Sequence, residues 1–216
     1  MTLPYQAAFI DLCVQIGVLR FGTFTLKSGR ESPYFFNAGL FNTGAAIGAV
    51  GRAYGAAISA SGLSFDMLFG PAYKGIPLVT ITAASLAEHA GRNVPFAFNR
   101  KETKDHGEGG AIVGSPLAGR VLIVDDVITA GTAIRESIEI IQAAGARPAG
   151  VLLALDRQER ASDGPLSAVQ EVQAQYGIPV IAVVSLGDLM HHVSLRGRAP
   201  DLSRMQTYRA RYGLAD

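Results

Sequence analysis

The sequence predicts a doubly wound α/β fold, with a mainly parallel sheet of about five strands flanked by helices and a small N-terminal hood. From Thr43 onward, helical stretches alternate with short runs of consecutive apolar residues. Such runs indicate strands that are buried on both faces, as in a parallel sheet. Hydrophobic residues make up 49% and charged residues 17% of the 216 residues, so the chain can bury a sizeable core.

Residues 1–42 are expected to form the hood. Apolar residues recur at helical spacing from 4 to 18, and Pro4 suits a first helical turn. Segments 22–26 and 34–36 are predicted to be short strands. They flank Lys27-Ser28-Gly29-Arg30, in which the Ser-Gly pair indicates a turn.

Residues 43–216 are expected to form one globular core. Its first helix carries Gly44, Gly48, Gly51 and Gly55 on one face. Each glycine costs a helix about 0.8–1 kcal/mol relative to alanine, so close packing against that face is the preferred explanation. The predicted strands are 67–69, 94–98, 121–124, 151–155 and 180–184, and the predicted helices are 43–60, 75–90, 132–144 and 166–176.

Composition and charge exclude several classes of protein. The 19 Lys and Arg nearly balance the 18 Asp and Glu, which argues against bulk attraction to nucleic acid or to an anionic membrane. Glycine, proline and asparagine interrupt the uncharged stretch 32–51, so it is not expected to span a membrane. The N-terminus lacks signal-peptide features, and Cys13 is interpreted as a buried hydrophobe. We therefore expect a cytoplasmic protein without nucleic-acid or membrane partners.

Segment 121–133 is the most informative part of the chain. A buried strand ends in two carboxylates and is followed by a short Thr/Gly loop and a helix. Ligands of open parallel sheets bind beyond the carboxyl ends of the strands. The backbone N–H groups at the helix N-terminus favour a phosphate there, and Thr129 and Thr132 can add hydroxyl donors. This segment therefore predicts a phosphate site.

Asp125 and Asp126 are acceptors, which suits them to sugar hydroxyls and a hydrated magnesium ion but not to the phosphate itself. The alternative is an Asp pair that caps the following helix. It explains the loop less well, since a cap needs only one carboxylate. The sequence has neither a Walker A motif nor a GxGxxG after a strand, so the common nucleotide cradles are not competing interpretations.

Segment 121–133 resembles the phosphoribosyl pyrophosphate signature of the type I phosphoribosyltransferases. The resemblance implies that the loop 129–133 holds the ribose 5-phosphate and that the acid pair contacts the ribose hydroxyls. It implies catalytic roles for Lys74, Lys104, Asp125 and Asp126. The implied contacts to phosphoribosyl pyrophosphate come from Tyr73, Lys74, Arg100, Lys101, Lys104, His106, Asp125, Asp126, Val127, Ile128, Thr129, Ala130, Gly131, Thr132 and Ala133.

Two further segments fit the same family. Segment 69–75 resembles its pyrophosphate loop, and segment 100–110 matches the position of its catalytic lid. From the residues alone, the Gly-Pro pair of the first segment could be an ordinary turn. The second segment, with three strong cations and three acids, could be a solvated loop.

The hood segment 26–37 resembles a stretch distinctive of orotate phosphoribosyltransferases. Orotate is a flat anion, so it needs a cation, backbone donors and an apolar wall. Taken alone, Lys27 could be a solvated turn residue, and Arg157, at a strand end, could be a surface salt-bridge partner. The resemblance instead implies that orotate is bound by Lys27, Phe35, Phe36, Thr129 and Arg157.

The resemblance implies a glycosyltransferase of the pentosyl class in pyrimidine biosynthesis. It would join orotate to 5-phosphoribosyl 1-pyrophosphate and release pyrophosphate. Mg²⁺ would be held through the substrate near Asp125, without a direct protein ligand. The family forms a homodimer whose lid 100–110 reaches the neighbouring site. Two alternatives are a purine phosphoribosyltransferase, which the hood argues against, and a transcriptional sensor, for which the sequence has no DNA-binding module.

Overall fold

The computed structural model describes residues 2–26, 28–101, 111–129, 131–160 and 164–214. Their centre is a six-stranded sheet in the order β5-β4-β3-β6-β7-β8, in which only β5 runs antiparallel to its neighbour. The predicted α/β fold is confirmed, with one more core strand than expected. The strands are β3 (Met67–Gly70), β4 (Phe96–Asn99), β5 (Ile112–Gly114), β6 (Arg120–Val124), β7 (Arg147–Asp156) and β8 (Val180–Ser185).

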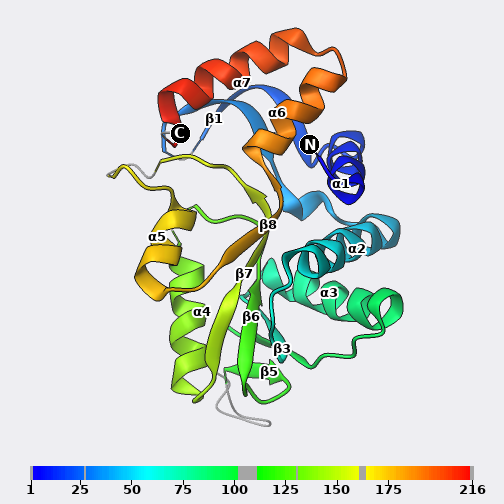
Figure 1. Cartoon of the computed structure of the whole chain (residues 1–216), viewed down its shortest axis with the longest axis vertical. Helices are drawn as coiled ribbons and strands as arrows, with labels where there is room; N and C mark the ends of the chain where they lie inside the picture. The colour runs from blue at the N-terminus through cyan, green and yellow to red at the C-terminus, as the bar shows by residue number, and fades with distance from the viewer. Residues whose placement is uncertain (1, 27, 102–110, 130, 161–163, 215–216) are drawn as a thin grey trace.

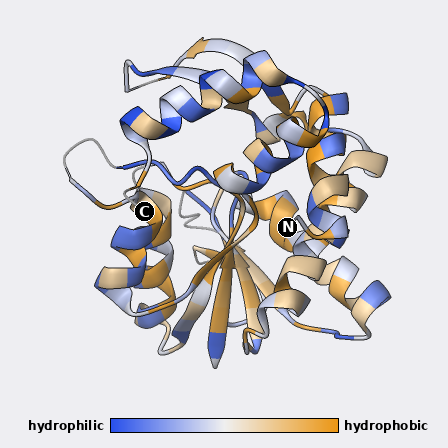
Figure 2. Cartoon of the chain, turned by 45° about the horizontal axis from the view of Figure 1, so that its top comes forward, coloured by the Kyte–Doolittle hydropathy of each residue, from blue (hydrophilic) through white to orange (hydrophobic). Residues whose placement is uncertain are grey.

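Helices cover both faces of this sheet (Figure 1). α2 (Gly44–Ser61) and α3 (Gly75–Ala90) pack on one face, while α4 (Thr132–Ala143) and α5 (Ala168–Tyr176) pack on the other. Successive residues along the strands enter different cores: Leu122 joins the α2/α3 side and Ile123 the α4 side. The strands are therefore hydrophobic along most of their length, as the colouring of Figure 2 shows.

A smaller layer lies at the carboxyl end of the sheet. It contains α1 (Pro4–Gln15), the antiparallel hairpin β1 (Leu19–Thr25) and β2 (Glu31–Phe36), the short helix η1 (Ala38–Leu40), and the C-terminal helices α6 (Leu186–Leu195) and α7 (Ala199–Tyr212). α7 packs on β2, where the rings of Tyr208 and Tyr34 meet edge to face with centroids 6.4 Å apart. The N-terminal hairpin therefore shares its layer with the end of the chain (Figure 1). The division into units 1–42 and 43–216 remains a prediction.

Glycines allow α2 and α3 to pack closely. A Cβ at Gly51 would lie 2.7 Å from the backbone oxygen of Ile81, and one at Gly55 would lie 3.4 Å from the Ser85 hydroxyl. Gly44 faces open space, and Gly48 would meet only the end of the Arg52 side chain at 3.7 Å. The packing explanation therefore holds for two of the four glycines on the predicted face.

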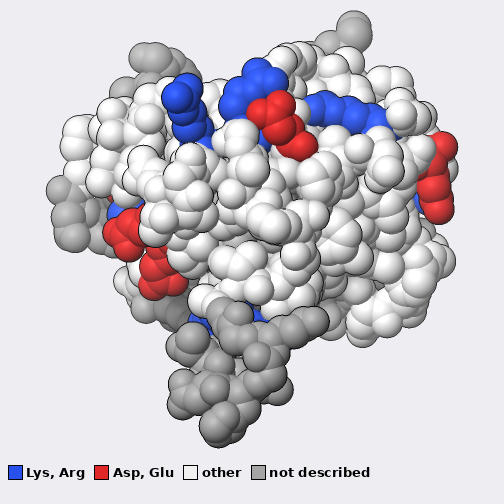
Figure 3. All heavy atoms as spheres, turned by 90° about the horizontal axis from the view of Figure 1, so that it is seen from below, with Lys and Arg blue, Asp and Glu red and all other residues white. Residues whose placement is uncertain are grey.

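The interpretation of Cys13 as a buried hydrophobe is confirmed. Cys13 is buried, and burial raises the pKa of its thiol. In Figure 3, which views the end of the molecule away from α6 and α7, positive and negative side chains lie scattered among uncharged ones. No helix within the described residues combines the length and apolar character needed to cross a membrane.

Candidate active site

The direction of the chain connections changes between two adjacent strands of the sheet. β3 leads through α3 to β4 on one side, whereas β6 leads through α4 to β7 on the other. Ligands of open α/β sheets bind at such a switch point, outside the carboxyl ends of the strands. An open pocket of about 330 Å³ lies there. It is lined by Pro71, Ala72, Tyr73, Lys74, Asp125, Asp126, Val127, Ile128, Thr129, Gly131, Thr132, Ala133 and Ile134.

The loop before α4 has the geometry of an anion site. Gly131 is the N-cap residue of α4 and has φ 70°, a left-handed conformation that favours glycine. Its lack of a side chain leaves the first N–H groups of the helix without a side-chain cap. The helix N-terminus therefore presents donors and a positive dipole end to the pocket. Because Gly131 occupies the cap position, the aspartates do not cap α4.

Backbone hydrogen bonds fix the acid pair beyond the last residue of β6. The Asp125 N–H donates to the Leu152 carbonyl at 3.0 Å, and the Asp126 carbonyl accepts from the Ala154 N–H at 2.8 Å. From α2, the buried Tyr54 hydroxyl donates to the Asp125 carbonyl at 2.9 Å. Both carboxylates are thereby held at the floor of the pocket, where their residues are 7% and 6% exposed.

The two carboxylates have different electrostatic surroundings. Burial, and then the neighbouring Asp126, raise the pKa of the Asp125 carboxyl to about 7. The Asp126 N–H donates to Asp125 Oδ1 at 2.9 Å, which partly offsets that rise. Asp126 forms an ion pair with Lys74, whose Nζ lies 2.6 Å from Oδ2. Asp126 is therefore charge-compensated, whereas Asp125 is the carboxylate whose ionisation is disfavoured.

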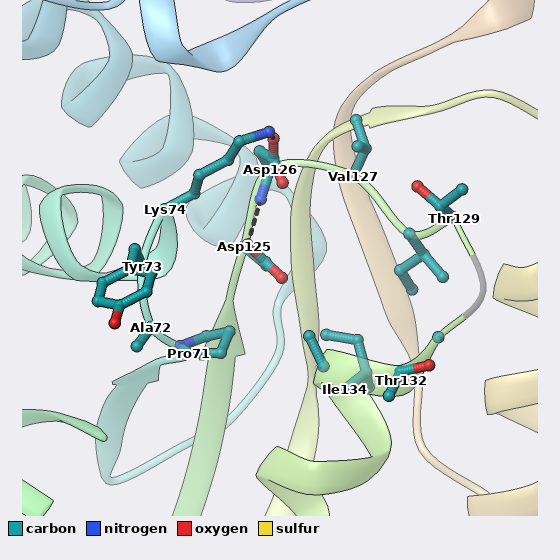
Figure 4. A pocket seen from close by; sticks show the side chains of 13 residues that line it. Pro71, Ala72, Tyr73, Lys74, Asp125, Asp126, Val127, Thr129, Thr132 and Ile134 are labelled. Atoms are coloured by element: carbon teal, nitrogen blue, oxygen red, sulfur yellow. Dashed lines mark hydrogen bonds and ion pairs between the residues drawn. The ribbon is translucent and has the colours of Figure 1, made fainter. Parts of the chain in front are cut away.

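Residues 71–74 form the opposite wall of the pocket in Figure 4, facing Thr129 and Thr132 across the acid pair. The loop can turn tightly because Gly70 and Gly75 pack together, and a Cβ at Gly75 would lie 2.8 Å from the Gly70 backbone. The Ala72 N–H donates to Asn99 Oδ1 at 2.8 Å, and the Ala72–Tyr73 peptide is cis. The Tyr73 ring is exposed, and Lys101 Nζ lies 5.3 Å from its centroid.

Of the residues expected to bind orotate that the structure describes, Thr129 lines this pocket, whereas Phe35, Phe36 and Arg157 do not. Phe35 stacks on Phe24 with ring centroids 5.6 Å apart, whereas Phe36 packs against Phe41 at 6.3 Å. Adjacent strand residues point to opposite faces, so the rings of Phe35 and Phe36 cannot both face one ligand. A ligand bound between the pocket and the hairpin would contact one of these two residues through its backbone.

Arg157 follows β7 and is not a surface salt-bridge residue. Its side chain is 24% exposed, and its Nε donates to Glu159 Oε1 at 2.9 Å. Its guanidinium carbon lies 5.2 Å from the centroid of the Tyr34 ring. Burial opposes its charge, yet Tyr34 and Glu159 hold the pKa of Arg157 above its ordinary value. The result is a partly buried permanent cation between the sheet and the hairpin.

Four predicted site residues, Lys27, Lys104, His106 and Ala130, lie outside the described residues. The described base of the predicted lid begins with Arg100, whose N–H donates to the Ala111 carbonyl at 2.7 Å. This hydrogen bond joins Arg100 to Ala111 next to the β4–β5 pair.

Several residues that shape the site carried no recognisable signal in the sequence. Tyr54 lies in the middle of a helix, and Glu159 and Tyr208 belong to segments without a motif. Asn99 has one usable signal, since it is a polar residue at the carboxyl end of a buried strand. The partners of the other three are distant in sequence, so only the folded chain reveals their contacts.

The carboxylate oxygens in the pocket suit a hydrated Mg²⁺ that is held mainly by a phosphorylated substrate. The described residues contain no group of three or more His, Cys, Asp or Glu side chains that could hold a metal ion. Two adjacent carboxylates remain, and Mg²⁺ commonly combines one or two carboxylates with substrate phosphates and water. Asp125 and Asp126 therefore fit the ion as substrate-side or water-mediated contacts.

Comparisons with known proteins agree on one family. The model of the phosphoribosyl transferase domain matches residues 40–175. An orotate phosphoribosyltransferase of Thioalkalivibrio sulfidiphilus is 64% identical over 211 residues, covering 97% of this chain and 99% of that protein. The crystal structure of an orotate phosphoribosyltransferase from Francisella tularensis is similar with a TM-score of 0.88 and 43% identity, covering 95% of this chain and 99% of that one.

A Mycobacterium tuberculosis orotate phosphoribosyltransferase, solved in complex with 5-phospho-α-D-ribosyl 1-diphosphate, has the same fold. Its TM-score is 0.64 at 24% identity, and the match covers 86% of this chain and 99% of that one. The family model spans more than half of the chain, and the T. sulfidiphilus relative matches nearly all of it. The chain belongs to the orotate phosphoribosyltransferase family of phosphoribosyltransferases.

Proposed function

We propose that this enzyme transfers the phosphoribosyl group of 5-phosphoribosyl 1-pyrophosphate to orotate, giving orotidine 5'-monophosphate and pyrophosphate. Membership of the family makes the chain a pentosyltransferase of pyrimidine biosynthesis. The observation that carries the proposal is the pocket at the β3/β6 switch point. A helix N-terminus, a buried acid pair and a second backbone loop surround one space there.

The α4 side of this pocket is suited to the 5-phosphate of the substrate. The uncapped N–H groups that follow Gly131 and the exposed hydroxyls of Thr129 and Thr132 are all donors. Asp125 and Asp126 would accept hydrogen bonds from the ribose hydroxyls. Val127, Ile128 and Ala133 complete the described wall around the sugar phosphate.

The loop 71–74 is suited to the pyrophosphate. It lies opposite the phosphate loop, the N–H groups of Tyr73 and Lys74 are the amides that it could offer, and Lys74 supplies a positive charge. Asp126 holds the Lys74 ammonium at 2.6 Å, and the Lys74 side chain is 56% exposed. We therefore propose that pyrophosphate draws Lys74 away from Asp126, which frees that carboxylate for the ribose. Tyr73 lines the pocket and Lys101 Nζ lies 5.3 Å from the centroid of its ring; together with Arg100 they would bind the outer phosphate oxygens.

The base would lie between this pocket and the hairpin. Arg157 suits the carboxylate of orotate because a guanidinium can donate two parallel hydrogen bonds to a carboxylate. Lys27 is proposed as the second cation on this side. Phe35 and Phe36 would contribute one apolar ring and one stretch of backbone.

In the reaction, the bond from C1 of the ribose to the pyrophosphate oxygen breaks, and its electron pair leaves with pyrophosphate. N1 of orotate, which reacts after it has lost its proton to solvent, forms the new bond to C1 from the opposite face. Lys74 and Lys104 stabilise the charge that develops on the leaving group. A bound Mg²⁺ would neutralise further phosphate charge. The predicted lid 100–110 excludes water, which would otherwise capture the cation-like sugar.

We also propose a homodimer in which the lid serves the partner's site, as the family resemblance implies. The cytoplasmic location expected from the sequence remains a prediction, as does the absence of nucleic-acid and membrane partners.

The substrate assignment is tested by incubating the protein with phosphoribosyl pyrophosphate, Mg²⁺ and one base at a time. Orotate should be consumed, orotidine 5'-monophosphate should appear, and omission of Mg²⁺ should abolish the reaction. Adenine and hypoxanthine are the control bases. Their consumption with orotate left untouched would contradict the proposal.

A further inference from the structure

One carboxylate oxygen of Glu159 joins Arg157, at the end of β7, to the hairpin. Glu159 Oε1 accepts from Arg157 Nε at 2.9 Å and lies 2.8 Å from its Nη2. The same oxygen accepts from the Tyr34 hydroxyl at 3.0 Å. The Glu159 side chain is only 12% exposed, so water screens these contacts weakly. An ion pair in this setting orients its partners more firmly than one on the open surface.

The geometry of the pair leaves one edge of the guanidinium available. Arg157 has five N–H donors in a fixed planar fork. Glu159 takes the side formed by Nε and Nη2, while the Tyr34 ring covers one face of the plane. Nη2 is buried and makes no well-directed hydrogen bond within the described residues. Among the described residues no hydrogen bond involves Nη1, so its N–H groups, on the edge away from Glu159, can serve a second carboxylate.

The end of the chain holds Glu159 in place. The segment 158–160 pairs with residues 212–214: Glu159 forms a β-bridge with Gly213, and the Arg160 N–H donates to the Tyr212 carbonyl at 2.9 Å. The Leu214 N–H donates to the Gln158 carbonyl at 3.2 Å. These contacts explain why a C-terminal segment without any motif is so well anchored next to the site.

Tyr208 completes the enclosure from α7. Its ring packs edge to face on that of Tyr34, and its hydroxyl is buried. Burial, and then the nearby Glu159 charge, raise the pKa of Tyr208 to about 12. Tyr208 therefore stays neutral at physiological pH. It helps to shield Glu159 from water and adds no second charge beside it.

We propose that Glu159 is a positioning residue for base recognition, which turns the free edge of Arg157 toward the carboxylate of the base and is itself held by the C-terminal segment 208–214. This inference rests on the proposed function, because it assumes that the base carries a carboxylate and that Arg157 binds it. It assigns a role to Glu159 and to the C-terminal segment 208–214, neither of which would contact the substrate.

The primary test is Glu159→Gln in the full-length enzyme. The variant keeps an acceptor oxygen and the side-chain volume but loses the charge that orients the guanidinium. We expect the KM for orotate to rise about tenfold, in line with the loss of one charged hydrogen bond, while kcat and the KM for phosphoribosyl pyrophosphate change less than about twofold. Glu139→Gln is the matched control, because Glu139 is an exposed glutamate on α4, and it should leave all three constants unchanged.

A double-mutant cycle separates positioning from a general structural role. Arg157→Ala should raise the KM for orotate more than Glu159→Gln does. If Glu159 acts through Arg157, the double variant should match Arg157→Ala alone instead of multiplying the two effects. Tyr34→Phe removes only the hydroxyl bonded to Glu159, so it should give a smaller rise in the same constant. It provides a second route if Glu159 variants fold poorly in thermal melts.

The outcomes distinguish this inference from the function on which it rests. If the unaltered enzyme does not use orotate, the proposed function is wrong. If it does and Arg157→Ala raises the KM for orotate, an unchanged KM in both Glu159→Gln and Tyr34→Phe would overturn the positioning role. Independent, multiplying effects in the double variant would overturn it as well.

Discussion

Asp125 and Asp126 are adjacent in sequence but have different electrostatic surroundings. Lys74 compensates the charge of Asp126. Burial, and then the neighbouring Asp126, raise the pKa of Asp125 to about 7. The pair is held by backbone hydrogen bonds to β7 and by the Tyr54 hydroxyl. Substituting either side chain should therefore change the chemistry of the pocket without unfolding the sheet.

Asp125→Asn and Asp126→Asn should each lower kcat while leaving the fold intact. Loss of one contact made in the transition state typically costs about 100- to 1000-fold in kcat. Steady-state rates with both substrates, alongside circular dichroism, measure the effect. Near-normal turnover in the double variant would show that the pair is not part of the catalytic machinery.

Asp125 should also make stability depend on pH. Its folded pKa of about 7 lies above the ordinary value of 3.8, so the folded state binds the proton more tightly than the unfolded state does. The wild-type protein should therefore lose stability relative to Asp125→Asn as pH rises from about 4 to about 7, and no further above that. Thermal melts of both proteins across this range measure the difference. A melting-point difference that does not change with pH would show that burial leaves this carboxyl unperturbed.

At the scale of elements, the packing of α2 against α3 supports the candidate active site. α2 supplies Tyr54, which holds Asp125, and α3 begins directly after the loop 71–74. Gly51 lets the two helices approach, since a Cβ there would lie 2.7 Å from the Ile81 carbonyl. The close approach of the two helices therefore supports the floor of the pocket and one of its walls.

Gly51→Ala should destabilise the protein, because the backbone of α3 would have to move. Overpacking of this kind typically costs about 1–3 kcal/mol in the free energy of unfolding. Gly48→Ala is the control in the same helix. Its Cβ would make an ordinary contact at 3.7 Å, so it should stabilise the helix by up to about 1 kcal/mol. Denaturant titrations that gave both variants the same sign would contradict this account.

At the scale of the whole molecule, the site depends on three distant parts of the chain. The loops proposed to bind phosphate and pyrophosphate follow β6 and β3, while Arg157 follows β7 and meets Tyr34 of the hairpin, which packs on α7. α7 closes over the hairpin from the other end of the sequence (Figure 1). The side proposed to bind the base thus combines the N-terminal hairpin and α7 around the end of β7.

The proposed dimer is tested by mixing two inactive variants under conditions of subunit exchange. Lys74→Ala damages a subunit's own pyrophosphate loop, whereas Lys104→Ala damages the lid lent to the partner. Each heterodimer should regain one intact site, so random exchange should restore about a quarter of wild-type activity. If exchange is demonstrated and the mixture stays inactive, the lid serves its own subunit.

The sequence by itself determined the order of the main elements and the phosphate loop. Apolar runs predicted five strands because buried parallel strands are apolar on both faces. The helix of α4 was predicted as 132–144 and found at Thr132–Ala143, because its apolar residues recur at helical spacing. The strand β5 was missed because three residues are too few to show a pattern, and α7 was missed because it is mostly polar.

Only the tertiary structure decided how polar side chains meet across the fold. The ion pair between Lys74 and Asp126 spans 52 residues, and the hydrogen bond between Tyr34 and Glu159 spans 125. The same structure showed that two of the four glycines on α2 face no helix. Local patterns record which face of an element is buried, whereas contacts of this kind depend on where the whole sheet brings separate loops together.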